Sequence, residues 1–76
     1  MRVLVTGAAT LDLPLRVLNL LEMQGTVVDR FVAERRGDMY YIRIDASALA
    51  NGREPLVVEK LRAMVLVTDV LLEAGR

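Results

Sequence analysis

One stretch of the chain, residues 13–32, constrains the fold more than any other. In its first half, apolar residues recur three or four positions apart, at Leu13, Val17, Leu20 and Leu21. This is the spacing of one helix face. Gly25 then stands where a helix end favours a left-handed residue, and the β-branched residues 26–28 favour extended backbone. The sequence therefore predicts a short amphipathic helix that leads directly into a strand.

The rest of the chain divides into segments with strand or helix character. The predicted strands are residues 2–6, 26–34, 39–46 and 67–73. Two helices are predicted, one from Asp12 to about Gln24 and one that begins near Glu54. Each contains a proline, Pro14 or Pro55, which a helix tolerates only in its first turn. Asp12 is the expected N-cap of the first helix, because its carboxylate can accept from the free N–H groups of that turn.

Side-chain alternation predicts which faces are buried. The third strand follows a hairpin turn at residues 36–38. One of its sides carries Tyr40, Ile42, Ile44 and Ala46, and the other carries Tyr41, Arg43 and Asp45. One side is therefore core and the other is wetter. In the preceding strand, strict alternation places Val28 and Val32 on the same side as Arg30. The second helix has a predicted buried stripe of Val57, Leu61 and Met64.

The order of these elements, strand-helix-strand-strand-helix-strand, predicts the fold class. Two right-handed crossovers of this length produce a four-stranded antiparallel sheet with both helices on one face, the ferredoxin-like α+β arrangement. We expect one domain that spans residues 1–76. The second sheet face then lacks a covering layer, and Leu4, Val70 and Leu72 are candidates to be left on it.

The composition favours a protein that works through contacts with other macromolecules. A chain of 76 residues buries only about 60% of its unfolded surface, yet 54% of these residues are hydrophobic. Part of the apolar surface is therefore expected to be covered by a partner. Ten basic and ten acidic residues give a formal charge of zero, which argues against a general nucleic-acid or acidic-membrane binder. No apolar run reaches the roughly 20 residues of a membrane span, and we expect a cytoplasmic protein.

No catalytic constellation is visible in the sequence. Histidine and cysteine are absent, so carboxylates are the only strong metal ligands, and we expect no metal or cofactor. Ser47 is interpreted as a turn residue, and Lys60 as part of a solvated helix face. The segment around Gly7 resembles the opening of a dinucleotide-binding turn, but it lacks the further glycines that such a turn needs.

The same element order occurs in RNA-recognition modules, which stack bases on aromatic side chains of the middle strands. Arg36 and Gly37, followed by Tyr40 and Tyr41, are faintly similar to their third-strand motif. Asp38, however, occupies an aromatic position of that motif, and the first strand has no aromatic residue. RNA binding is therefore the less favoured alternative.

The segment 16–28, RVLNLLEMQGTVV, resembles the first helix and second strand of ACT domains, which are small βαββαβ regulatory modules that typically bind amino acids. The segment 59–73, EKLRAMVLVTDVLLE, also resembles their ending. A short single-module chain of this style is most similar to the small regulatory subunits of acetolactate synthase, an enzyme of branched-chain amino-acid synthesis.

The resemblance implies a ligand-binding region around the first helix. Its positions in this sequence are Leu11, Asp12, Leu13, Gly25, Thr26 and Val27. Leu11 and Asp12 stand where effector-binding ACT domains commonly have Pro-Gly, and Val27 stands where they often have asparagine. The N-terminus of the helix is a possible carboxylate site through its free N–H groups. Because the usual polar positions are lost, the sequence leaves open whether any effector is bound.

Three functions remain as alternatives. The first is a non-catalytic module that pairs with itself, as homodimer or higher oligomer, and binds the large subunit of an enzyme, for which the resemblance implies acetolactate synthase. In the family, sheets typically join side by side, so the second strand is the expected edge for self-pairing. The second alternative is an allosteric amino-acid sensor for another enzyme. The third is a small RNA-binding domain.

Overall fold

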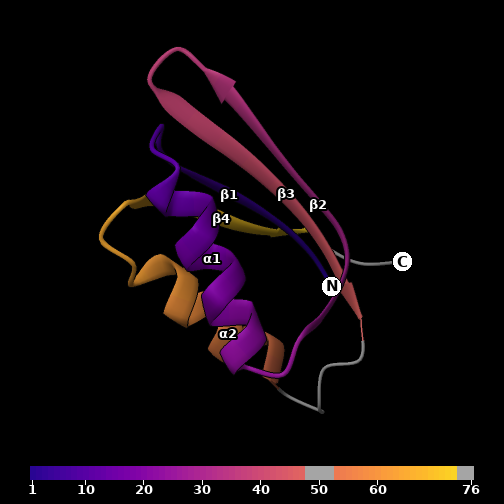
Figure 1. Cartoon of the computed structure of the whole chain (residues 1–76). Coiled ribbons are helices and arrows are strands. Elements are labelled where there is room, and N and C mark those ends of the chain that lie inside the picture. Colours follow the sequence, from indigo (N-terminus) through magenta and orange to yellow (C-terminus); the bar gives the residue numbers. More distant parts are fainter. Residues whose placement is uncertain (48–52, 74–76) are drawn as a thin grey trace.

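The computed structural model describes residues 1–47 and 53–73 of the chain. Its elements are β1 (Arg2–Ala8), α1 (Asp12–Met23), β2 (Val27–Arg36), β3 (Met39–Ser47), α2 (Arg53–Arg62) and β4 (Val67–Glu73). The four strands form one antiparallel sheet in the order β2-β3-β1-β4, and both helices cover one face of it (Figure 1). The predicted fold class is confirmed, because element order, strand direction and helix layer all agree.

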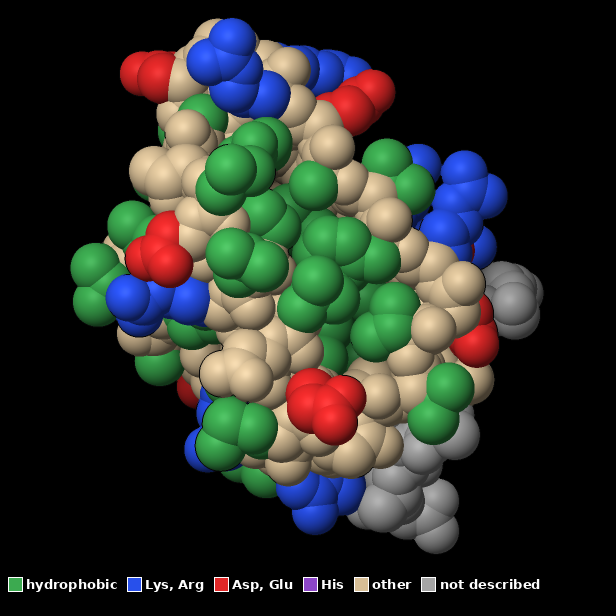
Figure 2. Space-filling view, viewed as in Figure 1, with side chains coloured by type: hydrophobic (Ala, Val, Ile, Leu, Met, Phe, Trp, Pro, Cys, Tyr) green, Lys and Arg blue, Asp and Glu red, His purple; other side chains and the backbone are tan. Residues whose placement is uncertain are grey.

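The core lies between the two helices and the sheet. Its fully buried side chains are Val3 and Val5 of β1, Ile42 and Ile44 of β3, Leu13, Val17 and Leu21 of α1, Val57 and Leu61 of α2, and Val70 of β4. The alternation predicted for β3 is therefore confirmed. Met64 lies beyond the end of α2 and is only partly buried against the core. Figure 2 shows further hydrophobic side chains on the surface between α1 and the β2–β3 hairpin.

Local backbone chemistry explains where α1 ends and where the hairpin turns. Gly25 has a φ of 72°, and the N–H of Thr26 donates to the carbonyl of Leu21 at 3.0 Å, so the helix ends at the predicted glycine. Gly37 has a φ of 62° in the turn between β2 and β3. The predicted N-cap is wrong. Leu11 is the N-cap of α1 and makes no side-chain cap hydrogen bond, whereas Asp12 lies within the first turn.

A β-bulge changes the expected alternation of β2. The register against β3 shifts between Val28 and Arg30, so Asp29 is an extra residue without a partner. The shift brings Val28 to the helix side of the sheet, where it packs on the core together with Phe31. Strict alternation placed Val28 on the side of Arg30, and that prediction is wrong because it did not include the bulge.

The register of β4 decides which apolar side chains the uncovered sheet face receives. Leu71 stands opposite Leu4 and is 53% exposed there, whereas Val70 stands opposite Val5 and is buried among the core residues. Leu72, two residues from Val70, shares its side of the sheet. The prediction for Leu4 is confirmed, and the predictions for Val70 and Leu72 are wrong because the sequence alone did not fix this register.

Candidate binding face of the sheet

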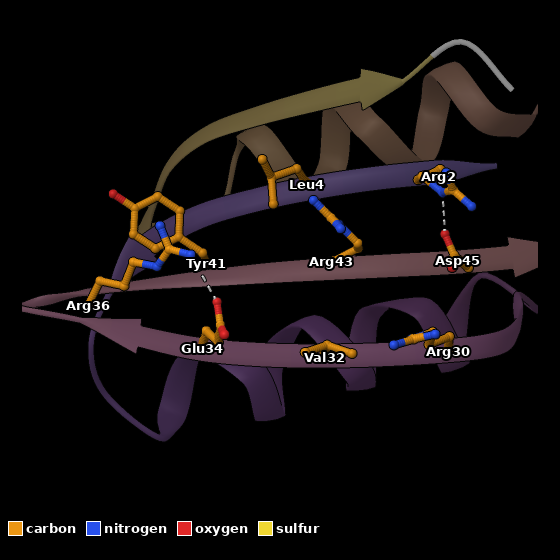
Figure 3. A pocket seen from close by; sticks show the side chains of 9 residues that line it. All are labelled: Arg2, Leu4, Arg30, Val32, Glu34, Arg36, Tyr41, Arg43 and Asp45. Atoms are coloured by element: carbon orange, nitrogen blue, oxygen red, sulfur yellow. Dashed lines mark hydrogen bonds and ion pairs between the residues drawn. The ribbon is translucent and has the colours of Figure 1, made fainter.

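The sheet face away from the helices carries a shallow depression of about 480 Å³. We call this surface the open face. It is lined by Arg2 and Leu4 of β1, Arg30, Val32, Glu34 and Arg36 of β2, and Tyr41, Arg43 and Asp45 of β3 (Figure 3). These residues alternate with core residues along each strand, because successive side chains of a strand point to opposite faces. Three strands therefore present four guanidinium groups and two carboxylates on one surface.

One end of the open face is organised around Arg2. Its Nε donates to Oδ1 of Asp45 at 2.7 Å, and Oε1 of Glu73 lies 4.0 Å away. This hydrogen bond to Asp45, together with the attraction of the two carboxylates, raises the pKa of the Arg2 guanidinium. The Arg2 side chain is 58% exposed, so the cluster is a solvated surface network. It fixes the orientation of Asp45 at this end of the depression.

The other end of the open face is organised around Arg36. Its Nη2 donates to Oε1 of Glu34 at 3.3 Å. The guanidinium carbon also lies 5.5 Å from the centroid of the Tyr41 ring, within the range of a cation–π contact. Tyr41 thus lies on the open face, as its alternation predicted, and Arg36 covers part of its ring. This leaves less of the ring free for the base stacking that an RNA-recognition module requires.

Arg43 occupies the centre of the open face. Its cross-strand neighbours are Leu4 on β1 and Val32 on β2, and the side chain points toward Leu4 (Figure 3). Within residues 1–47 and 53–73, no carboxylate lies within 4.0 Å of the Arg43 guanidinium. An exposed cation between two apolar side chains is suited to a partner that supplies both an apolar contact and a carboxylate.

The first three residues of the predicted ligand region lie at the start of α1, with different environments. Leu11 is 72% exposed, whereas Leu13 is fully buried in the core. The Asp12 carboxylate accepts from Nε of Arg16 at 2.8 Å. The N–H of Leu13 donates to the carbonyl of Thr10 at 3.1 Å, and the next residue is a proline without an N–H. Few backbone donors therefore remain at this helix end for an effector carboxylate.

The other three residues lie at the end of α1. Gly25 forms the left-handed turn, and Val27 is 51% exposed at the start of β2. The hydroxyl oxygen of Thr26 is buried, and it has no hydrogen-bond partner in the part of the chain that the structure describes. Of the two polar side chains in the predicted region, Asp12 is paired with Arg16, and Thr26 is buried without a partner among the described residues.

The structure does not bring the two halves of the predicted ligand region together within one chain. They are separated by the 12-residue helix α1, which is about 18 Å long. The start of the helix lies at the hairpin end of the sheet, where the N–H of Ala9 donates to the carbonyl of Asp38 at 3.2 Å. Val27 stands at the opposite end, paired with Ser47. A single small ligand therefore does not contact both halves within one chain.

The open face was not among the sites that sequence reasoning singled out. Alternation placed Tyr41, Arg43 and Asp45 on the wetter side of β3, but it did not show that Arg2 and Arg30, on other strands, lie alongside them. Among the described residues, no group of three or more carboxylate, histidine or cysteine side chains is placed to hold a metal ion. Neither helix in that part of the chain is long and apolar enough to cross a membrane.

Comparisons with known proteins agree with this architecture. The family model described as an ACT-like domain matches residues 2–76. The crystal structure of the ACT domain from GTP pyrophosphokinase of Chlorobium tepidum superposes with a TM-score of 0.79 at 11% identity, covering 92% of this chain and 91% of that one. A solution structure of the same domain gives 0.81 at 11% identity, with coverages of 99% and 85%. No curated protein matches the chain.

Proposed function

Because this chain belongs to the ACT-like domain family, we propose that it is a non-catalytic regulatory module that binds and tunes a separate catalytic subunit. The partner that we propose is the large subunit of acetolactate synthase, because the sequence pattern resembles that of the small regulatory subunits of this enzyme. The observation that carries the proposal is the amount of apolar surface. The large hydrophobic side chains that the chain exposes are Leu11, Leu15, Leu18, Met23, Val27, Val32, Leu56, Val65, Leu71 and Leu72.

The open face is the surface that we propose for the large subunit. Leu4, Val32 and Leu71 lie on three different strands of this face and form its apolar part. Arg43 stands between two of them and has no carboxylate partner of its own in the described residues. A partner that covers this face with apolar side chains and places a carboxylate on Arg43 would remove the exposed apolar surface and satisfy the guanidinium.

The direct test is reconstitution with the catalytic large subunit from the same organism. The chain is expected to co-purify with this subunit and to raise its acetolactate-forming activity or make it sensitive to an amino acid. The absence of both binding and any effect on activity would remove the acetolactate synthase assignment. Binding to a different catalytic protein from the same cell would support the role of a regulatory module and would identify a different partner.

A second candidate, an amino-acid sensor, is favoured by Thr26. The structure buries its hydroxyl without a partner among the described residues, directly after the left-handed Gly25. Leaving a buried polar group unpaired is costly, so a ligand that reaches this hydroxyl when neighbouring side chains move would gain a hydrogen bond. A thermal-shift screen with the common amino acids tests this function. A ligand at 100 times its dissociation constant adds about 2.7 kcal/mol to the unfolding free energy.

The control for this screen is Thr26→Val, which keeps the β-branched shape and removes the hydroxyl. A stabilisation by one amino acid that disappears in Thr26→Val would support the sensor. If no amino acid stabilises the wild-type chain, either alone or with its catalytic partner, the sensor is excluded and the docking module remains.

A further inference from the structure

A groove on the helix layer lies between α1 and the segment that joins α2 to β4. Its volume is about 360 Å³, and it is lined by one face of α1 and by residues 63–66. We call it the helix groove. The volume falls within the range of about 300–1,000 Å³ that is usual for small-molecule sites. The helix groove shares no residue with the open face or with the predicted ligand region, so the function proposed above makes no use of it.

Most of the helix groove is apolar. Leu20 and Met64 are partly buried against the core and contribute its inner part. Met23 and Val65 are 74% and 95% exposed and contribute its outer part. The two methionines suit a ligand-binding surface, because their flexible thioether side chains adapt to the shape of an apolar group. An aliphatic group bound here would remove this apolar surface from water.

The polar side chains of the helix groove lie together at one end of it. Arg16, Asn19 and Met23 follow one another at spacings of three and four residues, so they lie in this order along one face of α1. About 10 Å of helix rise separates Arg16 from Met23. A ligand that fits both parts of the helix groove is therefore polar at one end and apolar at the other.

The polar end is able to pair with a carboxylate. Nε of Arg16 donates to Oδ2 of Asp12 at 2.8 Å, and the other N–H groups of this guanidinium have no acceptor among the described residues. Within residues 1–47 and 53–73 the Asn19 side chain makes no hydrogen bond, so its amide group is also available as a donor. Both groups can donate to one carboxylate, because they are about one helical turn apart.

The charge of the helix groove selects among carboxylic acids. In the described part of the chain no carboxylate lines it, so the ammonium group of an amino acid would lack an ionic partner there. We propose that the helix groove binds a small aliphatic monocarboxylate. The carboxylate of this ligand accepts hydrogen bonds from Arg16 and Asn19, and its chain packs against Met23 and Met64.

The test uses the full chain without any catalytic subunit, so this inference and the proposed function can fail separately. The probe is isocaproate, a short branched monocarboxylate, which is titrated into the nitrogen-labelled chain while the NMR signals of the backbone amides are followed. Saturable shifts are expected at residues 19–23 and 63–66. Absence of saturable shifts, or shifts confined to the open face or to residues 11–13 and 25–27, overturns the inference.

Two relatives of isocaproate test the class of ligand. Isocaproamide keeps the chain and lacks the charge, and free leucine is isocaproate with an added α-ammonium group. Isocaproate is expected to bind about fivefold more tightly than either relative, because the amide loses the charge-assisted hydrogen bonds and leucine brings an ammonium group without a partner. Equal affinity for isocaproate and either relative overturns the proposed class of ligand.

Substitutions at the two ends of the helix groove test the assigned residues. Arg16→Gln removes the charge and is expected to weaken isocaproate binding by about tenfold. The fold should persist, because the Arg16 side chain is 62% exposed. Met23→Gln replaces an apolar side chain with a polar one of similar length and is expected to weaken binding by about threefold. Unchanged affinity in Arg16→Gln overturns the site.

Lys60→Gln is the matched control for the loss of charge. Lys60 is an exposed residue of α2 that does not line the helix groove, so Lys60→Gln removes one positive charge from the helix layer outside the site. This variant should bind isocaproate like the wild-type chain. Equal weakening by Arg16→Gln and Lys60→Gln would show a general effect of net charge and would also overturn the site.

Discussion

Gly7 of β1 and Leu13 of α1 are in direct contact: a Cβ added to Gly7 would stand 2.8 Å from Cδ2 of Leu13. The same Cβ would also meet the backbone carbonyl oxygen of Leu66, which accepts a hydrogen bond from the N–H of Ala8 at 3.0 Å. Gly7 is therefore needed for close packing of strand, helix and loop. The resemblance of this segment to a dinucleotide-binding turn has a structural explanation that involves no nucleotide.

Gly7→Ala is consequently expected to destabilise the chain by overpacking. The added methyl group meets the backbone of Leu66 and the buried side chain of Leu13, so neither neighbour can move freely. We expect a loss of about 1–3 kcal/mol in the unfolding free energy, measured by urea denaturation. An unchanged midpoint of urea denaturation would show that the backbone of Leu66 moves aside without a loss of stability.

Gly37→Ala tests a different property, the left-handed backbone of the hairpin turn. Gly37 has a φ of 62° and open space around the position of a Cβ, so the cost arises from backbone conformation alone. We expect a loss of about 1–2 kcal/mol. Gly37→Asn should cost less than Gly37→Ala, because asparagine tolerates this conformation better. Equal losses for the two variants would contradict this explanation.

The element order and the core of β3 could be predicted from the sequence because they depend on local periodicity. Apolar residues at Ile42 and Ile44 alternate with Tyr41 and Arg43, and the structure preserves this alternation. The helix end at Gly25 was predictable for the same reason, since the residue type and the change of pattern coincide there.

The errors in the sheet arose where non-local pairing decides the outcome. Whether Val70 or Leu71 reaches the uncovered face depends on the register of β4 against β1, which no local pattern specifies. Asp29 is an extra residue only in the pairing of β2 with β3, which the sequence of β2 alone does not specify. The open face combines side chains from three strands, so no single stretch of sequence marks Arg43 as its centre.

Substitutions of Leu13 and Leu11 distinguish a packing role from a ligand-contact role at the start of α1. Leu13 is fully buried, so Leu13→Ala is expected to cost about 2–5 kcal/mol of stability. Leu11 is 72% exposed, and Leu11→Ala should change stability by no more than about 0.5 kcal/mol. Urea denaturation of both variants gives the comparison. If an amino acid stabilises the wild-type chain, Leu11→Ala shows whether residue 11 contacts it without loss of the fold.

Arg43→Glu tests the proposed contact between the open face and a catalytic subunit. The Arg43 side chain is exposed and its cross-strand neighbours are apolar, so its reversal should leave the fold and the unfolding free energy nearly unchanged. In a complex, the same change places two carboxylates together where the water is excluded, and we expect the affinity for the large subunit to fall by about tenfold or more. Binding is measured by titration with the purified large subunit.

Lys60→Glu reverses a charge on the helix layer and should bind like the wild-type chain. Equal weakening by both variants would indicate a general effect of net charge, and no weakening by Arg43→Glu would place the docking surface elsewhere.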